Sequence, residues 1–321
     1  MISTNQISGK RILITGGAGF IANRLIRELL PLNEITIYDN FTRDTFSKSD
    51  LEHKSKVRVI KGDVLDLDSL TAATKDVDIF IHAAAIAGID TVAKDSVLTM
   101  KVNMLGTANA LEAAYRAGVS ERFINFSTSE VFGPYSYKSK ESEATVSGTA
   151  GEARWTYAVS KLAGEHLGLS YFRQHSLPVV NVRPFNVYGP GQTGEGALSI
   201  FIQKALKDNV IEIDGDGAQI RAWCYIDDFV EGLLLCIQNQ GAIGESINIG
   251  NSRATMTILG LANTVCRVIG SNSKIVHLAP LSEDIALRVP SLEKARRLIG
   301  FEAKVDLEEG IQRTAEWIKE N

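Results

Sequence analysis

Cysteine is scarce in this chain of 321 residues, which contains only Cys224, Cys236 and Cys266. The three are widely spaced and form no Cys-x-x-Cys pair, so neither a disulfide framework nor a zinc site is expected, and no metal ligands are predicted. No apolar run approaches the roughly 18–20 residues needed to cross a bilayer. The polar stretch 1–10 contains no signal-peptide core, and a cytoplasmic protein is therefore predicted.

Charge of either sign is also not in large excess. The 34 Lys and Arg residues stand against 38 Asp and Glu residues, which gives a net charge of −4. No cluster of Lys and Arg offsets this balance, so nucleic acid is not an expected partner. Hydrophobic residues make up 45% and charged residues 22%. Such a chain can bury a sizeable core, and its length suits one large α/β domain with an appendage or two domains.

The first half of the chain alternates short apolar runs with longer helical patterns. Leu105, Ala108, Leu111 and Tyr115 recur at the spacing of three and four that a helix requires. Strands that alternate with helices indicate βαβ crossovers and hence an α/β fold with a doubly wound parallel sheet. The predicted strands are 11–15, 34–38, 57–60, 78–81, 122–126 and 178–182, and the predicted helices are 21–30, 97–117 and 155–175.

The pattern loosens after about residue 188. Glycine-rich segments at 189–196 and 214–217 predict a loop and a tight turn. We expect a NAD-binding domain over 1–187 and a smaller C-terminal α/β substrate domain over 188–321, with part of the later chain returning to the first domain. The predicted helices here are 198–209, 226–238, 257–269 and 306–320.

The first predicted strand runs directly into Gly16-Gly-Ala-Gly19, and a helix follows. Gly16 permits a tight turn, Gly19 lets a pyrophosphate approach the backbone, and Ala22 keeps the helix close to the strand. The free N–H groups of a helix N-terminus favour phosphate. The pattern therefore predicts a Rossmann-type dinucleotide site, with Gly16, Gly19, Phe20 and Ile21 as cofactor-binding residues.

Acidic and small residues at the ends of the next strands extend this site. Asp39 ends the second strand, where a carboxylate binds the ribose hydroxyls and repels a 2′-phosphate, which favours NAD over NADP. Arg43 lies close by and leaves that choice open. Asp63 is placed either against adenine or as a turn cap, and His82 is interpreted as structural. The further predicted cofactor residues are Asn40, Asp63, Val64, Ala83 and Ala84.

Tyr157 and Lys161 lie four residues apart and therefore share one face of a helix. A lysine ammonium beside a phenol favours the phenolate, and we expect it to pull the tyrosine pKa below its usual value of about 10. Such a tyrosine takes a proton from a sugar hydroxyl while the carbon gives hydride to nicotinamide. Thr128, Ser129 and Glu130 follow a predicted strand, at the edge where ligands bind. These five residues are the predicted catalytic set.

Nine segments, in order along nearly the whole chain, resemble extended short-chain dehydrogenases/reductases that act on nucleotide sugars. The resemblance implies that Asn103, Pro184 and Phe185 serve the cofactor, with the latter two lining the nicotinamide. It also implies that Asn186 contacts the sugar or its diphosphate, that Arg221 and Arg288 hold the diphosphate, and that helices 97–117 and 155–175 form a homodimer. The segments are TGGAGFIA (15–22), YDN (38–40), GDVLD (62–66), HAAA (82–85), FSTSEVFG (126–133), YAVSK (157–161), RPFNVYGPG (183–191), GDGAQIRAWCYIDD (215–228) and RVPSLEKA (288–295).

Members of this family commonly oxidise C4 of the sugar, and the 4-keto sugar is then epimerised, dehydrated or decarboxylated. Glu130 resembles the glutamate of decarboxylases and 4,6-dehydratases, and Arg154-Trp155 with Arg288-Val-Pro-Ser291 is similar to the UDP-glucuronate decarboxylase branch. We therefore predict decarboxylation of a UDP-hexuronate, best UDP-glucuronate. The alternatives are a UDP-hexose or UDP-hexuronate 4-epimerase, a 4,6-dehydratase, and a non-catalytic NAD sensor. Departures from the family pattern are Ala22, Phe132 and Trp223-Cys224.

Overall fold

Seven parallel strands form the central sheet of the protein, whose computed structural model describes residues 7–49, 51, 54–281 and 284–321. Residues 1–6 of the polar N-terminal stretch lie outside the described residues. The two central strands β1 and β4 are buried almost throughout, as expected where helices cover both faces of a parallel sheet. In sheet order the strands are β12 (Glu245–Ile249), β7 (Val179–Pro184), β5 (Arg122–Phe126), β4 (Ile79–His82), β1 (Arg11–Thr15), β2 (Glu34–Asp39) and β3 (Arg58–Lys61).

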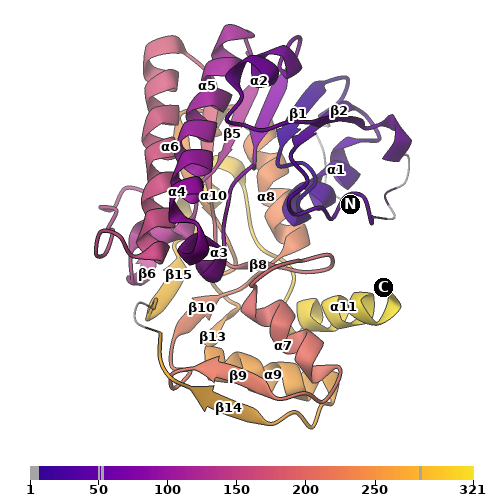
Figure 1. Ribbon diagram of the computed structural model, residues 1–321, viewed down its shortest axis with the longest axis vertical. Coiled ribbons are helices and arrows are strands. Elements are labelled where there is room, and N and C mark those ends of the chain that lie inside the picture. The colour runs from indigo at the N-terminus through magenta and orange to yellow at the C-terminus, as the bar shows by residue number, and fades with distance from the viewer. Residues whose placement is uncertain (1–6, 50, 52–53, 282–283) are drawn as a thin grey trace.

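Helices cover both faces of this sheet (Figure 1). Side chains alternate along a strand, so Ile12 and Ile14 of β1 join the core beneath α1 and α8, whereas Leu13 joins the core beneath α5. The predicted α/β class and doubly wound parallel sheet are therefore confirmed. No described helix has the length and apolar character needed to cross a membrane. The helices of this part are α1 (Phe20–Leu29), α2 (Leu67–Ala73), α3 (Ile89–Lys94), α4 (Ser96–Met100), α5 (Gly106–Arg116), α6 (Ala153–His175), α8 (Ile226–Gln238) and α10 (Glu293–Ile299).

Short strands and three helices form a second, smaller part beneath the carboxyl edge of the large sheet (Figure 1). These strands were not predicted, because each has only two to five residues, too few to show a clear period. The helices are α7 (Ala197–Ala205), α9 (Ile258–Ile269) and α11 (Leu307–Glu320). The strands are β6 (Tyr135–Ser139), β10 (Ile220–Ala222), β13 (Thr255–Thr257) and β15 (Leu287–Pro290) in one sheet, and the pairs β8 (Val187–Tyr188) with β11 (Cys224–Tyr225) and β9 (Ile211–Asp214) with β14 (Ile275–Leu278).

The helix predicted over 97–117 is not a single α-helix. A π-helical turn, Lys101–Leu105, separates α4 from α5. Asn103, within this turn, accepts a hydrogen bond from the backbone N–H of Ile86 at 2.8 Å and donates to the carbonyl oxygen of Ile86 at 2.9 Å. The turn is thereby tied to the loop that follows β4. A period of hydrophobic residues does not reveal such an insertion, which often marks a functional site.

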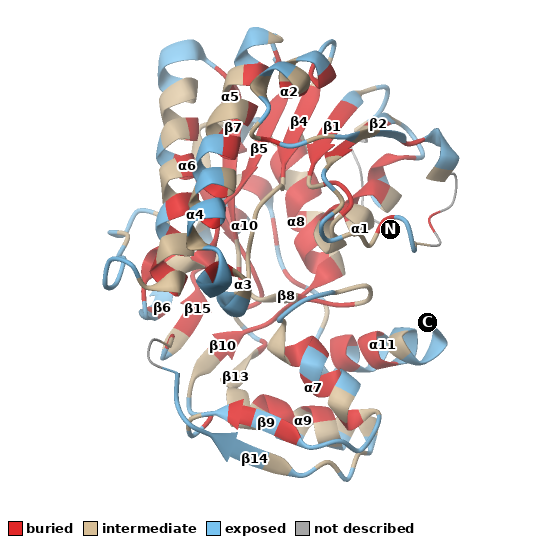
Figure 2. Cartoon of the chain, viewed as in Figure 1, coloured by how far each residue is buried: buried red, intermediate tan, exposed pale blue. Residues whose placement is uncertain are grey.

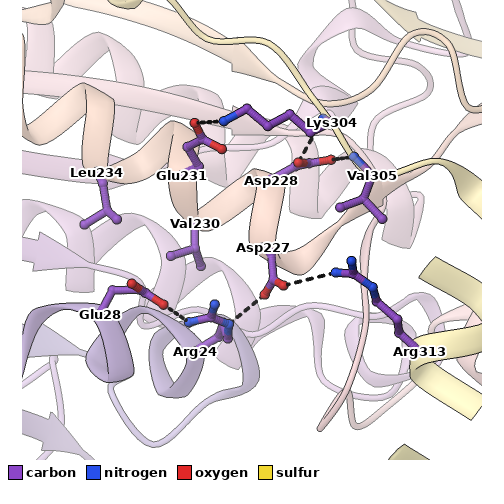
Figure 3. Close-up of a pocket in the computed structure, with 10 residues that line it drawn as sticks. All are labelled: Arg24, Glu28, Asp227, Asp228, Val230, Glu231, Leu234, Lys304, Val305 and Arg313. Atoms are coloured by element: carbon purple, nitrogen blue, oxygen red, sulfur yellow. Dashed lines mark hydrogen bonds and ion pairs between the residues drawn. The ribbon is translucent and has the colours of Figure 1, made fainter. Parts of the chain in front are cut away.

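A charged pocket lies where α1 and α8 meet the C-terminal helix α11 (Figure 3). Asp227 accepts a hydrogen bond from Arg24 at 2.7 Å and lies 3.9 Å from Arg313. Asp228 accepts hydrogen bonds, each 3.0 Å long, from the backbone N–H groups of 304–305. These contacts join elements far apart in the sequence, so we interpret the pocket as a structural junction.

Candidate active site

The glycine turn after β1 packs against the chain that follows β4. Gly16 has φ +70°, and a Cβ placed on it would lie 2.6 Å from the backbone nitrogen of Ala84. A Cβ on Gly17 would lie 2.8 Å from Ile37, so this glycine, which the sequence analysis left unassigned, is also required by close packing. Gly19 precedes α1 as its N-cap. The turn thus forms a cradle without side chains at the start of a helix, which fits a dinucleotide pyrophosphate.

Asp39 lies at the carboxyl end of β2, beside this cradle. Its two carboxylate oxygens accept hydrogen bonds from the backbone N–H groups of Ala18 at 3.0 Å and Phe41 at 2.7 Å. Each oxygen retains a lone pair for a ribose hydroxyl. The guanidinium of Arg43, which had left the choice between NAD and NADP open, instead donates to the carbonyl oxygen of Ala87 at 2.8 Å and to Thr91 at 2.9 Å.

The structure gives the other predicted cofactor residues mainly local contacts. The carboxylate of Asp63 accepts the N–H of Leu65, which is the turn-capping alternative of the sequence analysis. Val64 is buried against Gly106 of α5. Asn40 is exposed, and its side-chain oxygen accepts the N–H of residue 42. Ala83 donates its N–H to the carbonyl oxygen of Thr15 at 3.0 Å and so joins the ends of β4 and β1.

His82 is fully buried between two threonine hydroxyls. Its Nδ1 lies 2.8 Å from Thr15 Oγ1 and its Nε2 lies 3.0 Å from Thr107 Oγ1. The Thr107 hydroxyl proton is donated to the carbonyl oxygen of Asn103, so Nε2 of His82 must donate and Nδ1 must accept. Burial, with Lys161 nearby, lowers the pKa of His82 to about 3. The ring is therefore a neutral structural bridge between β1, β4 and α5, the helix that carries Thr107.

Tyr157 and Lys161 lie on α6, one turn apart. Lys161 is 2% exposed, and its Nζ has no hydrogen-bond partner in the described part of the chain. Burial lowers the pKa of Lys161 to about 8, and Glu165, one turn further on, opposes this effect. A buried ammonium without a partner is costly, and hydroxyl groups of a bound ribose would satisfy it. This unpartnered donor and the glycine cradle fit a nicotinamide dinucleotide.

The expected lowering of the Tyr157 pKa by Lys161 is wrong for the protein alone. Burial and the negative charge of Glu130 raise the pKa of Tyr157 above its usual value. The hydroxyl of Thr128, as a hydrogen-bonding neighbour, and the charge of Arg288 oppose this rise without cancelling it. The sequence analysis considered the lysine alone and could not weigh the desolvation of the phenol, which is the largest effect.

A short 3₁₀ turn, η3 (Ser129–Phe132), carries the other predicted catalytic residues beyond β5. Thr128 precedes it as its N-cap, and its hydroxyl accepts the backbone N–H of Glu130 at 3.2 Å, which caps the turn. Ser129 is buried beside them. Trp155 is buried at the start of α6 and packs against Gly148, where a Cβ would lie 2.1 Å from the indole nitrogen.

Three buried arginines and two half-buried carboxylates form a cluster next to Tyr157. Glu130 lies 3.2 Å from Arg154 and 3.4 Å from Arg288. Asp284 lies 3.5 Å from Arg154 and 3.2 Å from Arg221. Guanidinium groups therefore outnumber carboxylates by one, and this end of the site carries net positive charge. Asp284 could not be predicted as a site residue from the sequence. It lies four residues before Arg288, and only the pairing of β10 with β15 brings this part of the chain beside Arg221.

Burial lowers the pKa values of two of these arginines. The pKa values of Arg221 and Arg288 are each lowered to about 10, mainly by desolvation, although Asp284 and Glu130 respectively counteract it. Both groups remain charged near neutral pH. The Nε atoms of Arg154 and Arg288 have no hydrogen-bond partner among the described residues. The cluster thus holds unused donors that suit an anionic ligand.

The segment after β7 does not fully match its implied roles. Phe185 is wholly buried against Phe132, with ring centroids 6.2 Å apart, so its side chain does not line an open site. Pro184 is half-buried at the end of the strand. Asn186 has φ +38°, and its side-chain amide donates to the carbonyl oxygen of Ala222 at 2.8 Å. Asn186 therefore connects the large sheet to the substrate side in the protein alone.

The model of the NAD dependent epimerase/dehydratase family matches residues 12–250. The chain belongs to this family. It is an NAD-dependent enzyme, and the glycine cradle and Asp39 described above lie in the matched segment.

Members of the NAD dependent epimerase/dehydratase family resemble the chain over nearly its whole length. UDP-N-acetyl-alpha-D-glucosaminuronate decarboxylase of Bacillus cytotoxicus is 35% identical, over 97% of this chain and 98% of that protein. UDP-glucuronic acid decarboxylase 6 of Arabidopsis thaliana is 34% identical, over 95% and 87% respectively. The UDP-glucuronic acid 4-epimerase of Bacillus cereus, solved with UDP-glucuronic acid and NAD, has a TM-score of 0.88 at 31% identity and covers 97% of this chain and 99% of its own.

Proposed function

We propose that the protein oxidises C4 of a UDP-hexuronate, best UDP-glucuronate, and that the resulting 4-keto acid loses CO2. The observation that carries this proposal is the position of Glu130 between Arg154 and Arg288, beside Tyr157. A cationic cluster beside the phenol suits a sugar whose C6 is a carboxylate. The similarity to decarboxylases over the whole chain supports the same assignment.

The first chemical step is assigned to Tyr157, Lys161 and Thr128. The phenolate oxygen of Tyr157 accepts the proton of the C4 hydroxyl, and Thr128 holds the same sugar oxygen. The ammonium of Lys161 donates to the nicotinamide ribose and offsets the negative charge of the phenolate. When bound, NAD supplies the acceptor for the C4 hydride and later its donor. Because the pKa of Tyr157 is raised in the protein alone, with Lys161 already in place, the positive charge of bound NAD would have to add to that of the lysine for the phenolate to form.

The second step takes place at C5 and C6. A keto group at C4 makes the C6 acid a β-keto acid, so the C5–C6 bond breaks, CO2 leaves and its electron pair remains on C5 as an enolate. We assign Arg154 and Arg288 to the carboxylate before it leaves, which for Arg288 replaces the diphosphate role implied by the resemblance, because both arginines lie against Glu130. We assign to Glu130 and Ser129 the handling of the proton that then returns to C5. Arg221 and Asn186 are assigned to the diphosphate and the sugar.

A 4-epimerase acting on a UDP-hexuronate is the second candidate. It requires the same C4 oxidation and the same carboxylate-binding cluster, and it is favoured by the likeness to the Bacillus cereus 4-epimerase. In that reaction the keto sugar turns over in the site and is reduced on its other face, with no C–C bond broken. Dehydration is less favoured, because Ser129 stands where several dehydratases have an aspartate. A non-catalytic sensor is disfavoured by the presence of both Tyr157 and Lys161.

Product mass distinguishes these reactions. The protein, saturated with NAD, is incubated separately with UDP-glucuronate, UDP-N-acetylglucosaminuronate and UDP-glucose. We expect a product lighter than UDP-glucuronate by CO2. An unchanged mass with a new sugar in the NMR spectrum would instead assign a 4-epimerase, and loss of water from UDP-glucose would assign a dehydratase. No change in any of the three would contradict the proposal.

We further propose that residues 1–187, completed by β12, bind NAD and that 188–321 mainly bind the nucleotide sugar.

We also propose a cytoplasmic homodimer. The supporting observation is a set of exposed apolar residues on α4, the π-helical turn and α6, among which Val97 is 68% exposed; Figure 2 shows that α4 has exposed residues. The set comprises Val97, Leu98, Met104, Leu105 and Val159. L105D should convert a dimer to a monomer in light scattering, whereas L278D on exposed β14 should not; a monomeric parent protein would refute the dimer. Cell fractionation tests the location.

A further inference from the structure

One buried carboxylate, that of Glu165, gathers four elements beneath the candidate active site. Glu165 and Arg183 are 3% and 4% exposed, and they form a two-pronged ion pair in which both N–O distances are 2.8 Å. Ser246 donates to the other side of the carboxylate at 2.9 Å, and Ser127 donates to it as well. The carboxylate thus accepts four hydrogen bonds, and no water is needed to satisfy it.

Two of the four elements, α6 and β5, carry the predicted catalytic residues or lead directly into them. Glu165 is on α6, one turn beyond Lys161. Ser127 immediately precedes Thr128 at the end of β5, and Arg183 immediately precedes Pro184 at the end of β7. Ser246 lies on β12, which completes the sheet beside β7. A single side chain therefore sets how the helix with the phenol stands against the strand end with the threonine.

Stability alone does not account for this arrangement. Removing two charges from water costs several kcal/mol per ion, and well-packed apolar residues of similar volume often replace a buried pair without loss. The pair is therefore better explained by what it fixes. Arg183 also lies over the ring of Phe132, 4.9 Å from the centroid, so the same pair braces the turn that bears Glu130.

The charge of Glu165 matters for Lys161. The titratable or charged groups around Lys161 are Tyr157 and Glu165 on its own helix, His82 on β4, and Arg183 on β7 beyond Glu165. His82 is neutral and Tyr157 is protonated in the protein alone, so Glu165 is the negative neighbour of the ammonium. Consistent with this, Glu165 raises the pKa of Lys161 against the opposing effect of burial.

We propose that Glu165 is a positioning residue: it holds α6 against the ends of β5, β7 and β12, and it is the counter-charge that keeps Lys161 an ammonium. This inference rests on the proposed function, in which Lys161 acts as a cation beside Tyr157. It adds that a residue without contact to substrate or cofactor determines the upper pH limit of the reaction.

The test is the pH dependence of turnover and of NAD binding in E165Q. Glutamine keeps the shape and, through its one oxygen, accepts from one of the two serines, but it lacks the charge. Loss of a nearby opposite charge shifts a pKa by about one unit or more, so the alkaline limb of kcat should move to lower pH by about one unit. NAD affinity, measured without sugar, should fall off at correspondingly lower pH. Near pH 8, where the pKa of Lys161 lies in the parent protein, kcat should fall about fivefold.

R183M is the matched control, because it breaks the same buried ion pair but leaves the negative charge beside Lys161. In R183M the alkaline limbs of kcat and of NAD affinity should not move to lower pH, whatever the value of kcat itself. S246A, a milder change, should lower kcat about threefold through the lost tie to β12, with the limb unchanged. Equal acidic shifts in E165Q and R183M, or no shift in E165Q, would overturn the inference.

The two proposals fail separately. If Y157F kept full turnover, the proposed function would fall, but the NAD-binding limb of E165Q would still report on Glu165. If E165Q does not fold, as judged by thermal unfolding, S246A and R183M decide: unchanged kcat in both would contradict the positioning role.

Discussion

The two sides of the candidate site are formed by different kinds of chemical group. The cofactor side consists of backbone and small residues: Gly16 is pressed against Ala84, and the neutral ring of His82 lies beneath them. The substrate side consists of charges, with Arg154 and Arg288 around Glu130. In the proposed function, the first side recognises its ligand by shape and free N–H groups, and the second by electrostatics. Tyr157 lies between them.

Because of this difference, we expect that a substitution on one side can alter ligand binding there without altering ligand binding on the other side. Close backbone packing tolerates no added atom but is indifferent to salt, whereas a charged cluster tolerates changes of shape but not of charge. Variants on one side should therefore alter the binding of one ligand only.

The largest effect is expected at the residue between the two sides. Y157F removes the group that accepts the C4 proton, and kcat should fall about a thousandfold while the Kd for NAD stays within about twofold. Steady-state turnover and NAD titration measure the two quantities. Y171F is the matched control, since that phenol lies on the same helix but donates to Glu112. Turnover of Y157F at the parent rate would remove the assigned base.

On the substrate side, R154M should raise the KM for UDP-glucuronate about thirtyfold, the usual cost of losing a charge-assisted contact. Binding of UDP-glucose, whose C6 is neutral, should change about twofold or less, and NAD affinity should not change. R267M, which removes an exposed arginine paired with Glu308, serves as control. An equal loss for both sugars would show that Arg154 does not read the carboxylate.

On the cofactor side, G16A should weaken NAD binding about tenfold by moving the turn away from Ala84. Gly270 offers a close comparison: its φ is +74°, against +70° for Gly16, but a Cβ there would meet nothing within 4 Å. G270A therefore reports the backbone strain alone. Isothermal titration with NAD measures both variants, and equal affinities would mean that the contact with Ala84 does not form the cradle.

The smallest effect concerns acid stability. The folded pKa of His82, about 3, lies below the ordinary value of 6.5, so between these values the unfolded chain binds the extra proton. Stability must therefore fall as pH falls through that window. From pH 6.5 to about 5.5 the loss is about 1 kcal/mol, and H82Q, which has no such proton to bind, should lack it. Denaturant unfolding of both proteins at the two pH values tests this. If the free energy of unfolding of H82Q fell by the same amount between these pH values, His82 would be excluded as the cause.

The cofactor side was the more predictable from sequence, because its determinants are local. Gly16 and Gly19 lie in one turn, and Asp39 ends the next strand, so the strand and helix patterns suffice to place them. Gly17 escaped notice because its need for glycine arises from packing against Ile37 of a neighbouring strand.

The substrate side depends on contacts between distant segments. Asp284 reaches Arg154 and Arg221 only through the pairing of short strands that show no period. The Tyr157 pKa was misjudged for the same reason, since both burial and the approach of Glu130 are tertiary effects. Tyr157 and Lys161 themselves were correctly placed on one helix face, because four residues make one turn.

The most direct test of the account follows a single deuterium. UDP-glucuronate labelled with deuterium at C4 is mixed with a stoichiometric amount of the NAD-saturated protein and quenched during one turnover, and the bound dinucleotide is analysed by mass. Transient oxidation at C4 predicts that part of the dinucleotide becomes heavier by one deuterium and that the label is back at C4 of the final sugar. Product formation with a dinucleotide that never carries deuterium would contradict the account.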